Sequence, residues 1–289
     1  MKKVFLVFMG ILGMVLTNDV FAQALPTPVI PDNKVVAHRG GSREVGIPDN
    51  SLEALDYTIG LGCYASECDV YITKDDRVIV AHADREGKIN GLYPWEATFE
   101  EIVSAEKLKN GETIPSLEQY LDRVIEGGST LLWIDIKYLS FLPKEQADEL
   151  ARRAVDVSSV IVREKSAQNF VEFILPRLEV HEAAVKAANG DWACGLMDYR
   201  YAPEWFVQNG YDWANFQTNR VFYHDGEFRG EYSINDYLDK GVQVSVYHVD
   251  TELNREYYVG RLNEMRALTT NYPAALLQKI QEVRSKTDE

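Results

Sequence analysis

The feature that most constrains the fold is a regular alternation of short apolar runs with amphipathic helical runs along most of the 289-residue chain. Repeated strand-then-helix order favours an α/β fold with a parallel sheet, and this length best fits a (β/α)8 TIM barrel. No segment rich in Gly, Ser or Pro divides the middle of the chain, so one domain is the simpler interpretation. Nine strands are predicted, so one lies outside the barrel or is wrongly assigned: 35–37, 64–72, 78–81, 131–137, 170–175, 193–197, 213–216, 242–247 and 265–269. Helices are predicted at 51–61, 99–108, 116–126, 144–157, 181–188, 203–209 and 234–240.

The amino-terminal segment has the pattern of a secretory signal peptide. Lys2 and Lys3 precede an apolar run, and Ala22 and Ala24 are small residues of the kind that a signal peptidase reads. The run is too short to span a bilayer comfortably, and an uncleaved membrane anchor is the alternative. We expect a cleaved signal at 1–23, a linker at 24–33 and one barrel domain at 34–285, which places the mature protein in the periplasm or outside the cell.

The charge and the cysteine content narrow the classes of partner. The formal net charge is −15, so nucleic acid and anionic membrane surfaces are electrostatically poor partners, and a small molecule is favoured. No stable membrane insertion is expected of the mature chain, and the sequence specifies no oligomeric state. Three cysteines are too few for a disulfide framework; Cys63 and Cys68 could form one pair, but buried free thiols are the favoured interpretation.

Two acidic residues share a face of the second predicted strand. Residues i and i+2 of a strand point the same way, so Glu67 and Asp69 project together while Cys68 points to the opposite side. Adjacent carboxylates repel, and a strand that keeps both usually gives them a shared cation. An ordinary strand with a solvated acidic face is the alternative interpretation. The third predicted strand closes with His82.

Further polar residues follow the other strands of the predicted barrel. In such a barrel the carboxyl ends of the strands form the active face. The residues expected to meet there are His38 and Arg39 after the first strand, Glu67 and Asp69 on the second, His82 after the third, and Asp135 and Lys137 at the fourth. Three carboxylates suit Ca²⁺ or Mg²⁺, two histidines suit a general acid and base, and two cations suit an anionic oxygen. Each residue alone could be a structural hydrogen-bonding or ion-pairing group, but their convergence at successive strand ends favours a site.

The chain contains a series of short motifs in a fixed order. They are His38-Arg39-Gly40-Gly41, Pro48-Asp49-Asn50-Ser51, Glu67-Cys68-Asp69-Val70, Thr73-Lys74-Asp75, His82, Ile114-Pro115-Ser116-Leu117-Glu118, Asp135-Ile136-Lys137, the segment 244–250 and the segment 268–273. With these motifs the sequence resembles the glycerophosphodiester phosphodiesterases of the phospholipase-C-like phosphodiesterase superfamily. The resemblance is strong over about residues 34–140 and continues weakly to the end.

The resemblance implies a metal-dependent TIM-barrel enzyme that hydrolyses a small phosphodiester to glycerol phosphate and an alcohol. It implies that His38 and His82 are the acid–base pair and that Arg39 and Lys137 contact the phosphate. It also implies that one divalent ion, Ca²⁺ or Mg²⁺, is bound by the three carboxylates Glu67, Asp69 and Asp135. The chemistry agrees, because a phosphodiester has a poor alkoxide leaving group and needs a proton donor, a base and positive charge.

The sequence departs from the family pattern in places that bear on the metal and the substrate. The family usually has Glu at the position of Asp135 and Glu-Asn-Thr at 49–51, and both changes shorten a carboxylate by one methylene. His82 is followed by Ala83-Asp84 where the family has Asp directly. The usual Trp-Thr of a late strand is Tyr247-His248 here, so the part of the pocket that reads the alcohol is expected to differ.

Two other functions remain open at this stage. A sphingomyelinase-D-like phospholipase shares the paired histidines and an Asp-x-Lys such as Asp135 and Lys137, and it forms a cyclic phosphate; the segment Leu92-Tyr93-Pro94-Trp95 is its one small candidate for membrane docking. A non-catalytic binding protein could keep the barrel and the metal but would not need the acid–base pair. Of the remaining histidines, His248 is placed near a strand end within reach of the pocket, whereas His181 and His224 are expected at the surface.

Overall fold

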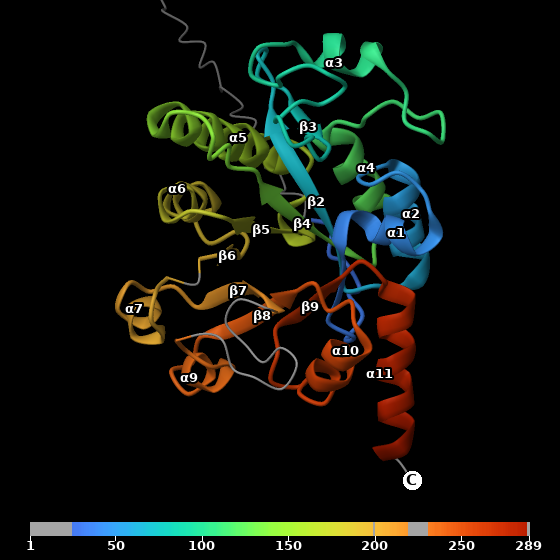
Figure 1. Cartoon of the computed structure of the whole chain (residues 1–289), viewed down its shortest axis with the longest axis vertical. Coiled ribbons are helices and arrows are strands. Elements are labelled where there is room, and N and C mark those ends of the chain that lie inside the picture. Colours follow the sequence, from blue (N-terminus) through green and yellow to red (C-terminus); the bar gives the residue numbers. More distant parts are fainter. Residues whose placement is uncertain (1–24, 199, 219–230, 288–289) are drawn as a thin grey trace, which may run out of the picture.

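A closed parallel barrel forms the centre of the computed structural model, which describes residues 25–198, 200–218 and 231–287 (Figure 1). The (β/α)8 architecture expected from the sequence is confirmed, because β9 pairs with β1 and β1 pairs with β2. The expected signal peptide and His224 lie outside the described residues. The barrel strands are β1 (Val35–Ala37), β2 (Ala65–Ile72), β4 (Leu131–Ile136), β5 (Val171–Leu175), β6 (Cys194–Leu196), β7 (Trp213–Gln217), β8 (Gln243–Tyr247) and β9 (Ala267–Thr270).

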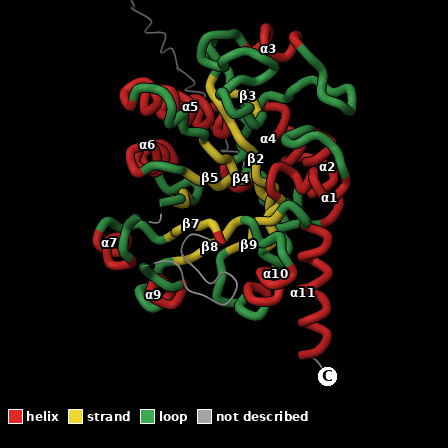
Figure 2. Tube along the Cα trace, in the orientation of Figure 1, coloured by secondary structure: helices red, strands yellow, loops and turns green. Residues whose placement is uncertain are grey.

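Helices surround the strands and bury their outer faces (Figures 1 and 2). Ser116, expected to begin a helix, caps α4 in a capping box with Gln119, and Ser51 caps α2. None of the helices in the described ranges is long and apolar enough to cross a membrane. The helical elements are η1 (His38–Gly41), α1 (Ser42–Val45), α2 (Leu52–Leu61), α3 (Phe99–Ala105), α4 (Leu117–Gly127), α5 (Lys144–Glu164), η2 (Gln168–Phe170), α6 (Leu178–Ala188), α7 (Pro203–Gln208), α9 (Ile234–Leu238), α10 (Glu252–Val259) and α11 (Pro273–Thr287).

The barrel strands alternate between an interior face and a helix-facing side. Cys68 of β2 packs in the core under the helices, as expected for a residue between two inward carboxylates. Trp133 of β4 and Trp213 of β7 fill the lower interior, with ring centroids 4.9 Å apart. Glu67 is opposite Trp133 in the strand register, and Asp69 is opposite Asp135. The two tryptophans pack beside the ion pair of Glu172 and Arg266, and the acidic residues of β2 and β4 follow toward the carboxyl ends of the strands.

The third predicted strand is not part of the barrel. β3 (Val78–Val80) runs antiparallel to β2, whereas β2 itself pairs directly with β4. The reason is the length of β2, which has eight residues and continues beyond the barrel before the chain turns at Thr73 and folds back. The Ala81 N–H then donates to the Asp69 carbonyl at 3.0 Å, so the reversal returns His82 to the region of Asp69. The hairpin and α3 project at the top of Figure 1.

His181 is buried, so the expectation of a surface histidine was wrong. Its side chain on α6 is 1% exposed and packs edge-on against Tyr211, with ring centroids 4.5 Å apart. Nε2 donates to the Cys194 carbonyl at 3.1 Å, while Nδ1 has no partner among the described residues. Burial lowers the pKa of His181 below its usual value. The three cysteines are free thiols, as favoured from the sequence.

We expect the free energy of unfolding to decrease when the pH falls below about 6.5, because the unfolded chain then takes up a proton that folded His181 resists. The loss levels off below the depressed folded-state pKa. A His181→Gln variant keeps a donor toward Cys194 but does not titrate. Urea unfolding between about pH 7 and 5 measures how steeply the free energy of unfolding changes with pH. This slope should be shallower for the variant than for the wild-type protein, by at most ~1.4 kcal/mol per pH unit. Parallel slopes for the two proteins would contradict this account.

Candidate active site at the carboxyl ends of the barrel strands

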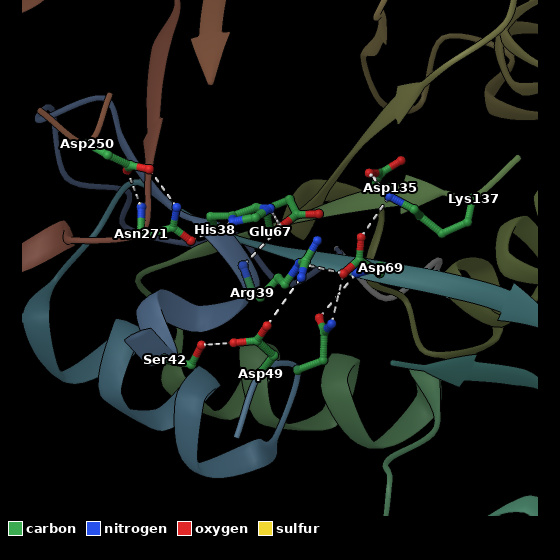
Figure 3. Close-up of polar contacts among 11 residues, drawn as sticks. His38, Arg39, Ser42, Asp49, Glu67, Asp69, Asp135, Lys137, Asp250 and Asn271 are labelled. Atoms are coloured by element: carbon green, nitrogen blue, oxygen red, sulfur yellow. Dashed lines mark hydrogen bonds and ion pairs between the residues drawn. The ribbon is translucent and has the colours of Figure 1, made fainter. Parts of the chain in front are cut away.

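A tight left-handed turn places the first two polar residues of the site. After β1 the backbone is left-handed at Arg39 (φ 51°) and Gly40 (φ 79°). A Cβ on Gly40 would lie 2.6 Å from the Cβ of Ala54 on α2, so only glycine fits there. The Asn50 N–H also donates to the Arg39 carbonyl at 3.3 Å. The turn is thus held against α2, and His38 and Arg39 lie over the ends of the strands (Figure 3).

Asp69 lies between the two cations of the site, as Figure 3 shows. Its fully buried carboxylate forms ion pairs with Arg39 Nε and with Lys137 Nζ, each at 2.9 Å. Asn50 donates to it from Nδ2 at 2.9 Å and accepts the Asp69 N–H through Oδ1 at 3.2 Å. Burial alone would favour the neutral acid, but Lys137 and Arg39 hold the pKa of Asp69 well below its usual range. Asp69 is therefore a permanent anion between two cations.

Glu67 and Asp135 complete an acidic cluster with the opposite electrostatic behaviour. Burial and the neighbouring carboxylates raise the pKa of Glu67 well above its usual value, and burial likewise raises that of Asp135. Glu67 Oε2 accepts the Arg39 N–H at 2.9 Å, and Lys137 Nζ donates to Asp135 Oδ2 at 3.0 Å. Within the described residues, Asp135 Oδ1 is buried and has no hydrogen-bond partner.

The three carboxylates fit a hard divalent cation. One oxygen from each of Glu67, Asp69 and Asp135 lies within 4.8 Å of the others. Oxygens bound to one Ca²⁺ at about 2.5 Å each can be up to about 5 Å apart, so the cluster is compact enough to share an ion. A cation would also satisfy the buried Asp135 oxygen and favour the ionised form of both carboxyls whose pKa is raised. The sequence expectation that these residues come together is confirmed.

The ring of His38 is oriented by two residues to which the sequence assigned no role. His38 Nδ1 lies 2.8 Å from Asn271 Oδ1, and Asn271 Nδ2 donates to Asp250 Oδ2 at 2.6 Å (Figure 3). Because a carboxylate only accepts, the Asn271 amide directs its oxygen to His38, so Nδ1 carries the proton. Burial and Arg39 lower the pKa of His38 to about 4. Nε2, which is 3.8 Å from Glu67 Oε2, is therefore a free base near neutral pH.

The two expected catalytic histidines line neighbouring cavities. His38, Arg39, Glu67, Asp135 and Lys137 line one of about 250 Å³. His82 is exposed and lines an adjoining cavity of about 470 Å³ with Asp49 and Asn50. Partial desolvation of the ring is the largest cause that lowers the pKa of His82; Asp69 raises this pKa and the neighbouring cations lower it, so the net direction is downward. The site residues predicted from the sequence thus lie around Asp69, with His82 on the outer side.

Residues that connect the site were harder to foresee. Asp49 accepts from Arg39 Nη1 at 3.2 Å and from the Ser42 hydroxyl. Asn271 and Asp250 fall in late motifs of the family resemblance, but asparagine after a strand is not by itself a functional signal. His248 does line the cavity that contains His38, as its position near a strand end indicated.

The fold and the site together define a (β/α)8-barrel protein with a buried acidic and basic cluster at the carboxyl ends of its strands. Residues 38–275 match the model of the glycerophosphoryl diester phosphodiesterase family. The chain belongs to that family, and the match includes the carboxyl-terminal half, where the resemblance was weak. A glycerophosphodiester phosphodiesterase of Bacillus altitudinis is 30% identical over 113 residues, which are 36% of this chain and 45% of that protein. The Bacillus subtilis protein YhdW is 33% identical over 97 residues, so these matches span less than half of each curated relative.

Solved structures show that the fold is shared along nearly the whole chain. A glycerophosphodiester phosphodiesterase from Parabacteroides distasonis superposes with a TM-score of 0.70 at 21% identity, covering 90% of this chain and 99% of its own. A phosphodiesterase from Oleispira antarctica, solved with its product sn-glycerol-3-phosphate, has a TM-score of 0.65 at 18% identity and covers 87% of this chain and 96% of its own. These likenesses concern the barrel architecture.

The turn after β1 makes a testable prediction through two glycines that both have positive φ. Gly40→Ala should lower the free energy of unfolding by roughly 1–3 kcal/mol more than Gly46→Ala, because only the Gly40 substitution forces a clash with α2. Gly46 (φ 74°) has nothing within 4 Å of an added Cβ, so it reports the backbone strain alone. Chemical unfolding of both variants measures the difference. Equal losses would show that the turn is not pressed against α2.

Proposed function

We propose that this protein hydrolyses glycerophosphodiesters to glycerol phosphate and an alcohol, with one divalent cation and the histidines His38 and His82. The observation that carries the proposal is the cavity in which His38, two cations and the acidic cluster meet. Family membership supports the reaction class. The product in the Oleispira antarctica relative, sn-glycerol-3-phosphate, supports the proposed product.

The charge of the site supports the cation. With all groups ionised, Glu67, Asp69 and Asp135 carry three negative charges and Arg39 and Lys137 carry two positive ones, which leaves −1. A phosphodiester is also an anion, so this cluster would repel it. A bound divalent ion reverses the sign to +1, and it supplies Lewis-acid stabilisation of the phosphoryl oxygens. Glu67, Asp69 and Asp135 are the residues that would hold the ion; its identity, Ca²⁺ or Mg²⁺, is open to the assay below.

The side chains divide the chemistry between them. Arg39 and Lys137 contact the nonbridging phosphoryl oxygens, where negative charge increases in the transition state. His38 Nε2 takes the proton from the attacking water, because Asn271 fixes its proton on Nδ1. His82, on the outer side, donates a proton from its protonated form to the oxygen of the departing alcohol, so the P–O bond breaks without releasing a bare alkoxide.

We also propose that this reaction takes place outside the cytoplasm. The support is the amino-terminal pattern, in which Lys2 and Lys3 precede an apolar run that ends near small residues. Glycerophosphodiesters are the deacylated headgroups of phospholipids, and an exported enzyme would meet them in the periplasm or medium. The strongly acidic composition is compatible with a small soluble substrate.

An assay with several divalent ions tests the reaction. Purified protein should release alcohol from glycerophosphocholine or glycerophosphoethanolamine with Ca²⁺ or Mg²⁺, and EDTA should abolish release until the ion is restored in excess. Phosphorus NMR should show glycerol phosphate, a monoester. A cyclic phosphate would instead indicate the sphingomyelinase-D-like reaction. Tight diester binding without turnover would indicate a binding protein, and the absence of turnover with every ion would refute the proposal.

Substitution of each histidine tests the acid–base pair. His38→Ala and His82→Ala should each lower kcat by roughly 10²-fold or more, because each removes one proton transfer. His181→Gln is the matched control, since His181 lies on α6 outside the site and the variant should keep the wild-type rate. The thermal midpoint of each variant separates lost catalysis from lost folding. Full activity in a folded His38 or His82 variant would remove that residue from the mechanism.

A further inference from the structure

His248 is a third histidine in the active-site cavity, and the proposed mechanism gives it no role. It follows β8 directly and has a left-handed backbone, with φ 67°, which is uncommon for a residue with a side chain. Its carbonyl accepts from Thr218 Oγ1 and Asn254 Nδ2, each at 3.4 Å, which stabilises this conformation. Its ring lies edge-on to His38, with centroids 5.6 Å apart. The strained backbone thus places an imidazole beside the proposed base.

The hydrogen bonding of His248 defines which ring nitrogen is left for a ligand. Gln217 Nε2 lies 3.1 Å from His248 Nδ1, and the amide nitrogen can only donate, so Nδ1 is the acceptor. The neutral ring then carries its proton on Nε2. Burial lowers the pKa of His248, which also favours the neutral ring. His248 therefore offers one N–H donor and no positive charge.

The wall of the cavity around His248 differs from the wall that binds phosphate. Residues from the β1, β2 and β4 side are charged, whereas β7, β8 and β9 contribute Asn215, Tyr247, His248 and Thr269. Thr269 is 3% exposed, and its hydroxyl has no hydrogen-bond partner within the described part of the chain. A buried hydroxyl without a hydrogen-bond partner costs free energy, and a hydroxyl of a bound ligand would supply the missing partner. The wall beside β7, β8 and β9 is thus uncharged and polar, and the hydrogen-bonding capacity of its Thr269 hydroxyl is not used.

We propose that His248 is a specificity residue whose Nε2–H donates to a hydroxyl of the glycerol group of the substrate, with Thr269 beside it. The inference rests on the proposed function and assigns the part of the cavity that recognises the glycerol. Neutral donors and acceptors match an uncharged diol, whereas the phosphoryl oxygens match Arg39 and Lys137. A cationic headgroup would gain nothing from an N–H donor. The glycerol therefore lies toward β7–β9, and the departing alcohol lies toward His82.

Two substrates that differ only in the hydroxyls test this assignment. Glycerophosphocholine and the n-propyl ester of phosphocholine have the same phosphate and headgroup, but the second lacks both hydroxyls. In His248→Phe, kcat/KM for glycerophosphocholine should fall about 10- to 100-fold, mostly through KM, and the fall for the propyl ester should be markedly smaller. His248→Gln places an amide N–H near the position of Nε2 and should recover part of the discrimination.

The controls separate the inference from the proposed function. Gln217→Leu removes the donor to Nδ1 and should reduce the discrimination between the two substrates by a smaller factor, without changing His248 itself. Thermal midpoints identify any variant that fails to fold, and Gln217→Leu then carries the test alone. If wild-type protein hydrolyses neither substrate, the proposed function fails and the inference with it. If wild-type protein is active but His248→Phe loses the same factor on both substrates, only the role of His248 is overturned.

Discussion

The buried charge of Asp69 is the constraint on which the other parts of the site depend. An unpaired carboxylate in this interior would cost several kcal/mol, and breaking a buried pair typically costs about 3–5 kcal/mol. Asp69 avoids that cost through Arg39, Lys137 and Asn50, which come from the turn after β1, the end of β4 and the loop before α2. The chain segments that build the site are therefore joined through one carboxylate. The contacts that stabilise this end of the barrel are therefore the same contacts that assemble the site.

The barrel supplies the buried surroundings that shift the ionisation of these groups. Glu67 and Asp135 point into the interior, where Glu67 is in register with Trp133, and both are largely removed from bulk water. The low polarity of these surroundings raises the pKa of both carboxyls, and it would strengthen the binding of a cation among them. The strand register contributes directly, because Asp69 opposite Asp135 brings two carboxylates to one level of the barrel. The strand register and the two-residue periodicity of β2 thus bring the three carboxylates together.

The sequence predicted the parts of the structure that follow from local periodicity. Alternation of strands and helices indicated the barrel. Because the carboxyl ends of barrel strands meet on one face, the sequence also predicted correctly that Glu67, Asp69 and Asp135 lie together. It left open which of the nine predicted strands lies outside the barrel, because the direction of a short apolar strand such as β3 depends on how far β2 extends beyond its neighbours. It also missed that His181 is buried, since one carbonyl and one aromatic ring from distant segments make that burial acceptable. Amides such as Asn271 carry no pattern of their own, so their roles appear only in three dimensions.

The two walls of the cavity differ in how tightly they are coupled to the fold, and this bears on how substrate choice can change. On the charged wall, replacing Asp69 would leave Arg39 and Lys137 without their shared partner, so the arrangement of the site and its stability would be lost together. On the uncharged wall beside β7, β8 and β9, the His248 ring is held through Gln217 and its exchange removes no buried charge. Substitutions at His248 are therefore expected to alter how the glycerol group is recognised while the charged cluster stays assembled. A barrel built in this way can keep one phosphoryl chemistry and vary the molecule on which it acts.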